Sequence, residues 1–251
     1  MPLPPFLRKA IHQLPAPLRR ALRRANSVRV VRGFQPADWE YNALAASTLR
    51  PGDCAVDAGA NIGYVTKLLA LLVGPSGRVH AFEPVAETHG IHEHGMAALG
   101  LAQVLSHQAG VSDQPGDARM TVPEYANGGR NFYESHVTRD GGGESVHLVT
   151  LDQTLADESR PVRFIKIDVE GHELEAVRGA RAVIQRHRPT LLIEVQGDPA
   201  AADGNAAALF HLLDTWGYTA HLWRGGACVP WRAGQTSVDY IFLPRPEAPS
   251  P

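Results

Sequence analysis

Residues 55–63 read Ala-Val-Asp-Ala-Gly-Ala-Asn-Ile-Gly, and this stretch decides the fold. Apolar residues lead into Asp57, a turn with Gly59 and Gly63 follows, and the apolar run at 64–72 is typical of a buried helix. A strand, a glycine turn and a helix in this order form the first unit of an open α/β sheet. At such a unit a ligand can contact a strand end and the N-terminus of a helix together. The stretch therefore predicts a ligand site at the end of its strand.

A second strand is predicted at residues 78–82, and Glu83 ends it. An acidic side chain about 20 residues beyond a glycine turn suits hydrogen bonding to the two hydroxyls of a ribose. Dinucleotide enzymes usually carry G-x-G-x-x-G, whereas only Gly59 and Gly63 are present in this turn. Asp57 would repel a pyrophosphate but could receive the ammonium group of an amino acid attached to a nucleoside. S-adenosylmethionine is the common ligand of this kind, and a nicotinamide-dependent oxidoreductase is the alternative.

Four motifs follow one another along the chain. They are Val-Asp-Ala-Gly-Ala-Asn-Ile-Gly-Tyr at 56–64, Ala-Phe-Glu-Pro at 81–84, Thr-Leu-Asp at 150–152, and Ile-Lys-Ile-Asp-Val-Glu-Gly-His-Glu at 165–173 with Val177 and Gly179 after it. Together they resemble the FkbM family of S-adenosylmethionine-dependent methyltransferases, over roughly residues 53–194. The resemblance implies a Rossmann-like, doubly wound α/β fold. Its sheet is expected to have seven strands, mostly parallel, with an antiparallel last strand.

The resemblance also implies S-adenosylmethionine as the cofactor. Ligands of open α/β sheets bind outside the carboxyl ends of the strands. There we expect Asp57 to hold the amino-acid end and Glu83 the ribose. By analogy with the fold, Val111 is expected against the adenine ring and Asp113 at its edge. The predicted cofactor residues are Asp57, Gly59, Ala60, Asn61, Gly63, Glu83, Val111 and Asp113.

The predicted fourth strand, at residues 162–169, leads into the candidates for catalysis. The resemblance favours O-methylation of a hydroxyl on a sugar or a secondary metabolite, a reaction to which a positioned base contributes about 10²–10⁴-fold. The candidates are Asp168, Glu170 and His172, of which Asp168 is expected to face the transferred methyl group. Alternatively, this carboxylate pair only shapes the turn, and the base is then Glu194, His136 or a loop residue. A catalytically idle methyltransferase-like subunit is a third interpretation.

Composition narrows the class of protein. Charged residues make up 20% of the 251 residues and the formal net charge is −2, so no global field favours nucleic acid. We expect a small-molecule or glycan acceptor, and the sequence does not indicate the oligomeric state. Cys54 and Cys228 form no disulfide framework and no zinc-ligand pairing, which suits a reducing cytoplasm, with Cys54 as a small core residue. No apolar run reaches the ~18 residues of a membrane span and no signal peptide opens the chain, so we expect a cytoplasmic protein.

A predicted helix at residues 86–99 contains a histidine pair. His89 and His92 are three residues apart, so one helix face could present both to a metal ion. No third ligand is evident nearby in the sequence. We therefore expect a solvated histidine face and no metal.

Residues 1–37 contain eight basic residues and no acidic one, so the rest of the chain carries about −10. Their leucines recur at three- and four-residue steps, which predicts two short amphipathic helices broken at Pro15 and Pro17. They could contact an anionic membrane surface weakly, without stable insertion, but a cap on the domain is the favoured interpretation. We expect a basic helical cap at 1–50, the methyltransferase domain at 51–245 and a disordered tail at 246–251.

Two further segments carry expectations. Before the first strand, a helix is predicted through Leu49 with Asp38 as its N-cap, and Trp39 and Tyr41 are expected in the core rather than in a lid over the cofactor. Residues 114–148 are irregular and glycine-rich, which is typical of a functional or mobile loop. Its candidates for contact with the substrate are Asn131, Tyr133, Ser135 and His136.

Overall fold

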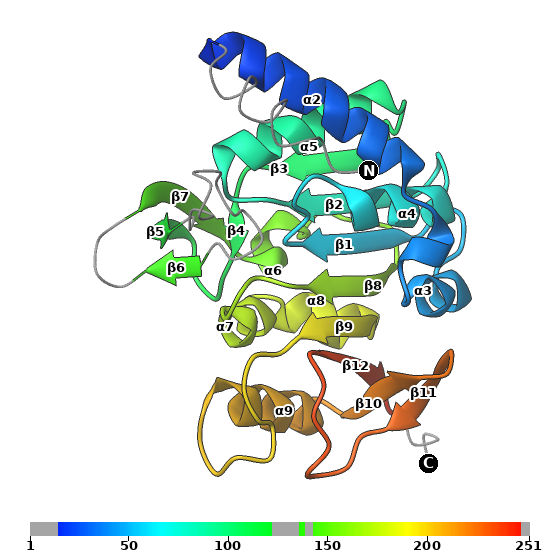
Figure 1. Cartoon of the computed structure of the whole chain (residues 1–251). Coiled ribbons are helices and arrows are strands. Elements are labelled where there is room, and N and C mark those ends of the chain that lie inside the picture. Colours follow the sequence, from blue (N-terminus) through cyan, green and yellow to red (C-terminus); the bar gives the residue numbers. More distant parts are fainter. Residues whose placement is uncertain (1–14, 122–135, 139–142, 247–251) are drawn as a thin grey trace.

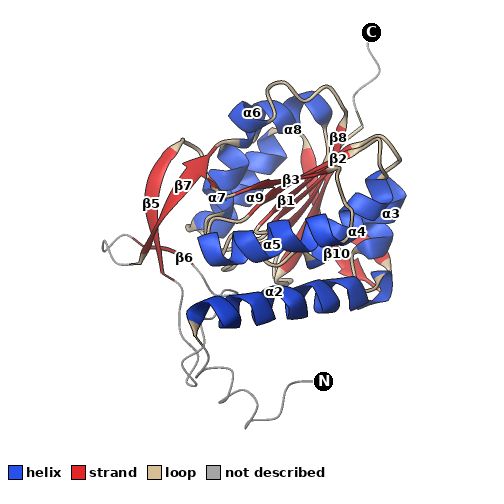
Figure 2. Cartoon of the chain, turned by 90° about the horizontal axis from the view of Figure 1, so that it is seen from above, coloured by secondary structure: helices blue, strands red, loops and turns tan. Residues whose placement is uncertain are grey.

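The computed structural model describes residues 15–121, 136–138 and 143–246. One eight-stranded sheet forms the centre of the molecule, with helices on both faces (Figures 1 and 2). Its strands, in order across the sheet, are β3 (Val104–His107), β2 (Arg78–Phe82), β1 (Cys54–Ala58), β8 (Val162–Ile167), β9 (Thr190–Glu194), β12 (Asp239–Pro244), β10 (Tyr218–Arg224) and β11 (Ala227–Pro230). The first five are parallel, and β12 is antiparallel to its neighbours β9 and β10. The doubly wound fold with an antiparallel last strand is thus confirmed.

The count of seven strands was one short. The segment between β10 and β12 forms the additional strand β11, which pairs with β10 as a hairpin. Gly225 and Gly226, with φ of +57° and +82°, form its two-residue turn. Glycine is favoured there because the turns that match the twist of a hairpin need positive φ.

The helices divide between the two faces of the sheet (Figure 2). One face carries α2 (Ala16–Gly33), α3 (Asn42–Thr48), α4 (Tyr64–Val73) and α5 (Ala86–Ala98). The other carries α6 (Leu151–Thr154), α7 (Glu173–Arg178), α8 (Arg181–His187) and α9 (Asn205–Thr215). After β8 the chain forms two short helices, α7 and α8, which meet near Gly179. A Cβ atom at Gly179 would lie 1.9 Å from the carbonyl oxygen of Ser112, so the chain packs here backbone against backbone.

Strand β1 lies between β2 and β8, and its register positions the site. Ala58 is opposite both Phe82 and Ile167, so β1, β2 and β8 end at one level. The residues that follow these strands, Gly59, Glu83 and Asp168, therefore meet at the same edge of the sheet. All of β1 is buried, which is why its sequence is apolar apart from the residue that serves the site.

The irregular region predicted at 114–148 supplies most of a second sheet, ordered β4-β7-β5-β6, in which β4 lies just before that region. Its strands are β4 (Gly110–Val111), β5 (Gly116–Thr121), β6 (His136–Thr138) and β7 (Glu144–Val149). It stands beside the carboxyl ends of β1 and β2 (Figure 1). Of the predicted substrate-facing residues, Asn131, Tyr133 and Ser135 lie outside the described residues, and His136 begins β6.

The amino-terminal segment is described from Pro15 onward, and it forms one helix, α2. The predicted break at Pro17 was wrong, because proline is tolerated in the first turn of a helix, where its missing N–H has no partner to lose. Helix α2 packs on α5, and Arg23 forms an ion pair with Glu87 of that helix. Among the described residues, no helix combines the length and the apolar character needed to cross a bilayer.

The segment after α2 differs from its prediction in one detail. Asp38 does not cap α3: it belongs to a 3-10 turn (Pro36–Asp38) and accepts a hydrogen bond from the N–H of Gln35 at 2.7 Å. Tyr41 precedes α3 and is 7% exposed, so its predicted place in the core is confirmed. Trp39 packs partly buried against the same apolar cluster.

Lys67 of α4 holds the carboxyl end of α2. Its Nζ donates to the carbonyl oxygens of Val31, Arg32 and Phe34 at 3.2, 2.9 and 2.6 Å. The last carbonyls of a helix lack partners within it, and this ammonium donates to three carbonyls at that end, of which Val31 also accepts from the N–H of Phe34. Val31 is fully buried. These contacts support the interpretation of α2 as a packed cap, and the division at residues 50 and 245 is retained as a proposal.

Replacing Lys67 with methionine is expected to lower the free energy of unfolding by about 1–3 kcal/mol, because hydrogen bonds to a charged group are lost. Urea denaturation followed by circular dichroism measures this. Arg32→Met is the matched control, since Arg32 is an exposed basic side chain at the same helix end. Equal stability of the Lys67 variant and the control would contradict the role of Lys67. Unchanged stability together with loss of binding to anionic liposomes in these variants would favour the membrane interpretation.

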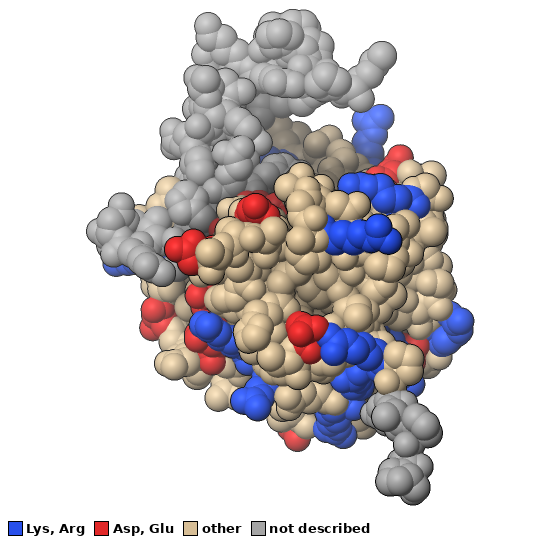
Figure 3. Space-filling view, turned by 90° about the horizontal axis from the view of Figure 1, so that it is seen from below, with Lys and Arg blue, Asp and Glu red and all other residues tan. Residues whose placement is uncertain are grey.

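Charged side chains are dispersed on the face that carries the carboxyl-terminal part of the chain. Figure 3, seen from below, shows basic and acidic side chains separated by large uncharged areas on this face. The described residues on this face form no continuous basic field of the kind that attracts nucleic acid.

Candidate functional site

A cavity of about 200 Å³ opens at the carboxyl ends of β1, β2 and β8, beside the second sheet. All the predicted site residues line it except Gly63 and Asp113. Its lining consists of Asp57, Gly59, Ala60, Asn61, Tyr64, Val65, Phe82, Glu83, Pro84, Ala109, Gly110, Val111, Met120, Leu148, Lys166, Asp168, Val169, Glu170 and His172. Met120 and Leu148 come from β5 and β7, so the region predicted as a functional or mobile loop supplies an apolar wall.

The glycine turn is shaped by a close approach of two backbones. Gly59 has φ +83°, and a Cβ atom there would lie 1.8 Å from the carbonyl oxygen of Asp168. The N–H groups of Gly59 and Ala60 both donate to the carbonyl of Phe82, at 3.0 and 2.9 Å. Gly63, with φ +99°, precedes the first residue of α4. Gly63 therefore starts the helix instead of lining the cavity.

Glu83 is fixed at the cavity by two backbone groups. Its Oε2 accepts from the N–H of Asn61 at 3.1 Å, and its Oε1 accepts from the N–H of Val85 at 3.0 Å. Burial raises the pKa of Glu83 to about 7, although these two hydrogen bonds act in the opposite direction. Each carboxylate oxygen retains capacity for one more hydrogen bond. The side chain can therefore accept two vicinal hydroxyls, as a ribose would present them.

A lysine joins the two carboxylates of the site. Lys166 Nζ lies 2.9 Å from Asp168 Oδ2 and 3.8 Å from Asp57 Oδ1. Burial would lower the pKa of Lys166, but the carboxylates of Asp168 and Asp57 outweigh it and raise the pKa to about 12. Asp57 is fully buried, which raises its pKa against the effect of the Lys166 ammonium. The site thus offers charges of both signs within one wall of the cavity.

Lys166 was not among the predicted site residues. It stands between two isoleucines on a buried strand, and a lysine is almost never buried unless it is paired. A lysine within a buried apolar strand was the feature of the sequence that could have indicated a charged partner at this position.

Asp57 is also held by a chain of hydrogen bonds on its side away from Lys166. Its Oδ2 accepts from Thr66 Oγ1 at 2.6 Å, and Thr66 Oγ1 lies 3.0 Å from Nε2 of His92. The other ring nitrogen of His92 lies 2.9 Å from Ser106 Oγ. Burial lowers the pKa of His92 to about 4, so the ring is neutral. Because the Thr66 hydroxyl donates to Asp57, it accepts from Nε2–H of His92, and Nδ1 accepts from Ser106.

The expectation of a solvated histidine face on α5 was wrong for His92. This residue is 1% exposed, because the chain of hydrogen bonds through Thr66 and Ser106 satisfies both ring nitrogens inside the protein. His89, the other histidine of the predicted pair, is half-buried.

Three acidic side chains meet beyond Lys166. One carboxylate oxygen from each of Asp168, Glu170 and Glu194 lies within 4.8 Å of the others, an arrangement that could hold a cation. Burial and then the neighbouring charges of Asp168 and Glu170 raise the pKa of Glu194 to about 7. Glu170 has φ +54° and accepts a hydrogen bond from Gln196 at 3.1 Å. This group, which we call the acidic cluster, can take up a proton near neutral pH.

Of the two predicted residues His172 and Asp113, only His172 lies at the cavity. His172 lines the cavity, and its Nε2 lies 2.9 Å from Ser112 Oγ while its Nδ1 lies 3.6 Å from Glu175. Asp113 is exposed and accepts from the Ser112 hydroxyl at 3.3 Å. The structure therefore does not bring Asp113 to the cavity. Val111 is 2% exposed and lines the cavity, as predicted. Ser112, which was not among the predicted site residues, holds His172 beside the cavity.

Two curated proteins are similar in sequence to part of this chain. The chain is 26% identical over 142 residues to "Methyltransferase 1" of Beauveria bassiana, a match that covers 49% of this chain and 57% of that protein. It is 29% identical over 136 residues to "Hexuronic acid methyltransferase AglP" of Haloferax volcanii, covering 53% of this chain and 52% of that protein. The chain thus spans about half the length of these curated relatives.

A solved structure of methyltransferase FkbM from Methylobacillus flagellatus KT is similar with a TM-score of 0.49 and 16% identity, over 88% of this chain and 59% of that one. The family model of the methyltransferase FkbM domain matches residues 57–220, which is more than half of the chain. That span begins at Asp57 and includes the glycine turn, Glu83, Lys166 and the acidic cluster. The chain therefore belongs to the FkbM methyltransferase family.

Proposed function

We propose that this chain transfers a methyl group from S-adenosylmethionine to a hydroxyl of a sugar. The observation that carries the proposal is the pairing, in one cavity, of Glu83 with the oppositely charged Asp57 and Lys166. Glu83 suits the two hydroxyls of a ribose. The others suit the zwitterionic amino-acid end of the same ligand, whose ammonium and carboxylate need partners of both signs.

The residues present fit this cofactor along its length. Glu83 accepts the ribose hydroxyls, and the glycine turn lets the ligand approach the backbone where α4 begins. The apolar wall of Val111, Met120 and Leu148 suits a flat ring. When bound, S-adenosylmethionine supplies a methyl group that is already activated by its sulfonium.

The acidic cluster is assigned to the acceptor. Asp168 lines the cavity beside Lys166, and its carboxylate can orient a hydroxyl and accept its proton as the new bond forms. Glu194, with its pKa raised to about 7, stands next to it as a second proton acceptor. Glu170 lines the cavity from the same cluster, whereas His172 is bonded to Ser112 and is given a supporting role.

The acidic cluster also bears on the substrate class. Carboxylates accept hydrogen bonds from hydroxyl groups but repel other carboxylates. We therefore propose a neutral, polyhydroxylated acceptor in preference to a uronic acid, even though one relative is named a hexuronic acid methyltransferase. A hydroxyl on a secondary metabolite is the same chemistry.

The test is to incubate the protein with methyl-labelled S-adenosylmethionine and a panel of neutral glycans, uronic acids, secondary metabolites and RNA. A labelled neutral glycan is the expected product. Labelled RNA or uronic acid would overturn the proposed acceptor. Binding of NADH but not of S-adenosylhomocysteine would favour the oxidoreductase alternative, and cofactor binding without any labelled product would favour an idle subunit.

Cofactor affinity is expected to rise with pH, because the ionised form of Glu83 accepts hydroxyl hydrogen bonds better than the protonated form. With a pKa of about 7, affinity should be about tenfold weaker at pH 6 than at pH 8. In Glu83→Gln this dependence should be absent. Titration calorimetry with S-adenosylhomocysteine in two buffers measures both the affinity and the proton released.

The same group gives a stability signature without ligand. The pKa of Glu83 is raised on folding, so its contribution to stability is fully present below about pH 4.5 and is lost as the pH rises through about 7. Glu83→Gln should flatten this part of the profile. An unchanged pH dependence in both the affinity and the stability of the variant would contradict the assignment of Glu83.

A further inference from the structure

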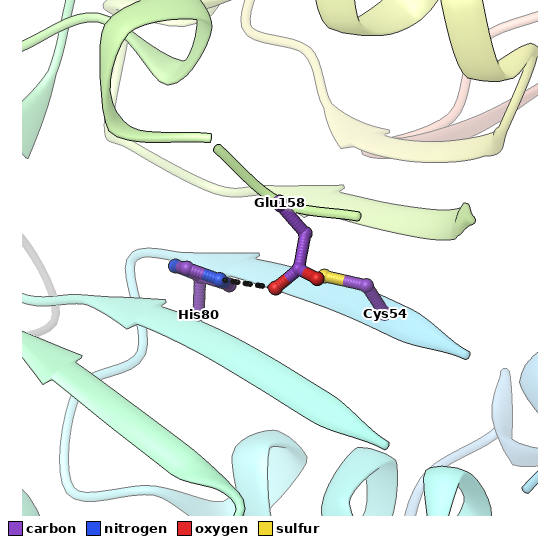
Figure 4. Close-up of side chains that lie close together, drawn as sticks. All are labelled: Cys54, His80 and Glu158. Carbon is purple, nitrogen blue, oxygen red and sulfur yellow. Dashed lines mark hydrogen bonds and ion pairs between the residues drawn. The ribbon is translucent and has the colours of Figure 1, made fainter. Parts of the chain in front are cut away.

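A second group of titratable side chains lies outside the cavity: Cys54, His80 and Glu158 (Figure 4). Cys54 is the first residue of β1, His80 lies on β2, and Glu158 belongs to the connection between α6 and β8. Cys54 is fully buried, His80 is 5% exposed, and the side chain of Glu158 is 7% exposed. Within the described residues, the cavity lining includes none of the three.

The three side chains converge. One ligand atom from each, the sulfur of Cys54, a ring nitrogen of His80 and a carboxylate oxygen of Glu158, lies within 4.8 Å of the other two. Figure 4 shows the thiol and the imidazole directed toward the same carboxylate from two neighbouring strands. His80 Nε2 lies 3.3 Å from Glu158 Oε2. Two ligands about 2.0–2.1 Å from a tetrahedral zinc ion would lie about 3.3 Å apart.

The remaining polar atoms of two of these residues are already held. His80 Nδ1 lies 3.1 Å from Nε2 of His107, whose ring stacks on that of His80 with centroids 5.3 Å apart. Glu158 Oε1 accepts from the backbone N–H and from the guanidinium of Arg160, at 2.9 and 3.1 Å. These contacts orient His80 Nε2 and Glu158 Oε2 toward the thiol. Partners that fix a ligand through its other polar atom are the usual surroundings of a metal site.

We propose that Cys54, His80 and Glu158 bind a zinc ion. A thiolate, an imidazole and a carboxylate are the three ligand types that zinc takes from proteins, and a water molecule would complete the tetrahedron. On binding, a sulfur–zinc bond forms and the thiol proton leaves to solvent, with no change of oxidation state. The proposal departs from the expectation that Cys54 is only a core residue, because its partners are separated from it by 26 and 104 positions and no local spacing reveals them.

The role of this ion would be structural. The site joins β1 and β2 to the connection that leads into β8, and so ties together the three strands that end at the cofactor cavity. Cys54 begins β1, at the opposite end of the strand from Gly59, and His80 lies in the middle of β2. Bound zinc is therefore expected to stabilise the fold without entering the methyl-transfer chemistry.

The test uses the full-length, tag-free protein and Co²⁺, which reports a thiolate ligand by a charge-transfer absorption in the near ultraviolet. One equivalent of Co²⁺ should produce this band, and one equivalent of Zn²⁺ should abolish it and raise the melting temperature by several degrees. Cys54→Ala should lose the band. Glu158→Gln should weaken Co²⁺ binding at least tenfold. Cys228→Ser, which removes the other cysteine, on β11, is the matched control and should behave as the wild type.

Three outcomes would overturn the proposal. One is the absence of the band in wild-type protein at 100 μM Co²⁺, as about that concentration corresponds to weak, non-structural binding. Another is loss of the band in Cys228→Ser and not in Cys54→Ala. The third is Co²⁺ binding that produces no thiolate band and that is lost in Asp168→Asn. This result would place the ion at the acidic cluster. Near-ultraviolet circular dichroism shows whether each variant is folded. If Cys54→Ala does not fold, the loss of Co²⁺ affinity in Glu158→Gln provides the test.

Discussion

Asp168→Asn is expected to slow single-turnover methyl transfer about 10²-fold or more at saturating cofactor. Asp168 lines the cavity, and its Oδ2 lies 2.9 Å from Lys166 Nζ, an ammonium that fixes the position of the carboxylate. Asparagine preserves the size of the side chain but cannot accept the proton of an acceptor hydroxyl. The measurement is rapid-quench transfer of a labelled methyl group, with cofactor affinity determined separately because Lys166 also loses its partner.

His172→Ala provides the comparison for this variant. Its ring is bonded to Ser112, so the rate loss should be smaller than that of Asp168→Asn. Glu194→Gln tests whether the proton passes on within the acidic cluster. The rate of the wild type should rise with pH through about 7, and this rise should disappear in the Glu194 variant. Full activity in a normally folded Asp168→Asn would show that the carboxylate only builds the turn after β8.

Gly59→Ala is expected to have the largest effect on the fold, lowering the free energy of unfolding by about 3–5 kcal/mol or preventing folding. Two costs combine. The residue has φ +83°, which an L side chain rarely adopts, and its Cβ atom would lie 1.8 Å from the carbonyl oxygen of Asp168. A backbone oxygen cannot rotate aside, so the carboxyl ends of β1 and β8 must separate. Cofactor binding should be lost with them.

Two other glycines separate these costs. Gly100 has φ +72°, and a Cβ atom added there would meet no other atom within 4 Å, so Gly100→Ala should show only the backbone cost of about 1–2 kcal/mol. Gly33, which also has open space around it and has no positive φ, should tolerate alanine. Chemical denaturation of the three variants gives the comparison. A Gly59 variant as stable as the Gly100 variant would mean that β1 and β8 are free to move apart.

The sequence predicted those features that depend on neighbouring residues. The bounds of β2 and the start of α4 follow from apolar runs next to glycines, and Glu83 follows from its distance to the glycine turn. The arrangement of Lys166 between Asp57 and Asp168 depends on which strands pair, which periodicity does not encode. The buried position of His92 likewise depends on Thr66 of another helix. The group of Cys54, His80 and Glu158 is the extreme case, since its members come from three separate elements.

Other errors came from local rules that have exceptions. Proline usually ends a helical pattern, but Pro17 stands in the first turn of α2, where it costs no hydrogen bond. Glycine usually marks a loop, but the pair at 225–226 makes the tight turn that creates β11. In both cases the position of the residue within the element, and not its identity, determined the structure.

The central position of β1 has a consequence for synthesis on the ribosome. One edge of β1 pairs with β2, but the other pairs with β8, whose first residue follows more than 100 positions later. At about 5–20 residues per second, that edge of the nascent chain remains unpaired for roughly 5–20 s. An open apolar strand edge is a template for aggregation. The amino-terminal half is therefore expected to depend on a chaperone until β8 emerges, and slow translation between residues 59 and 161 should lower the yield of folded protein.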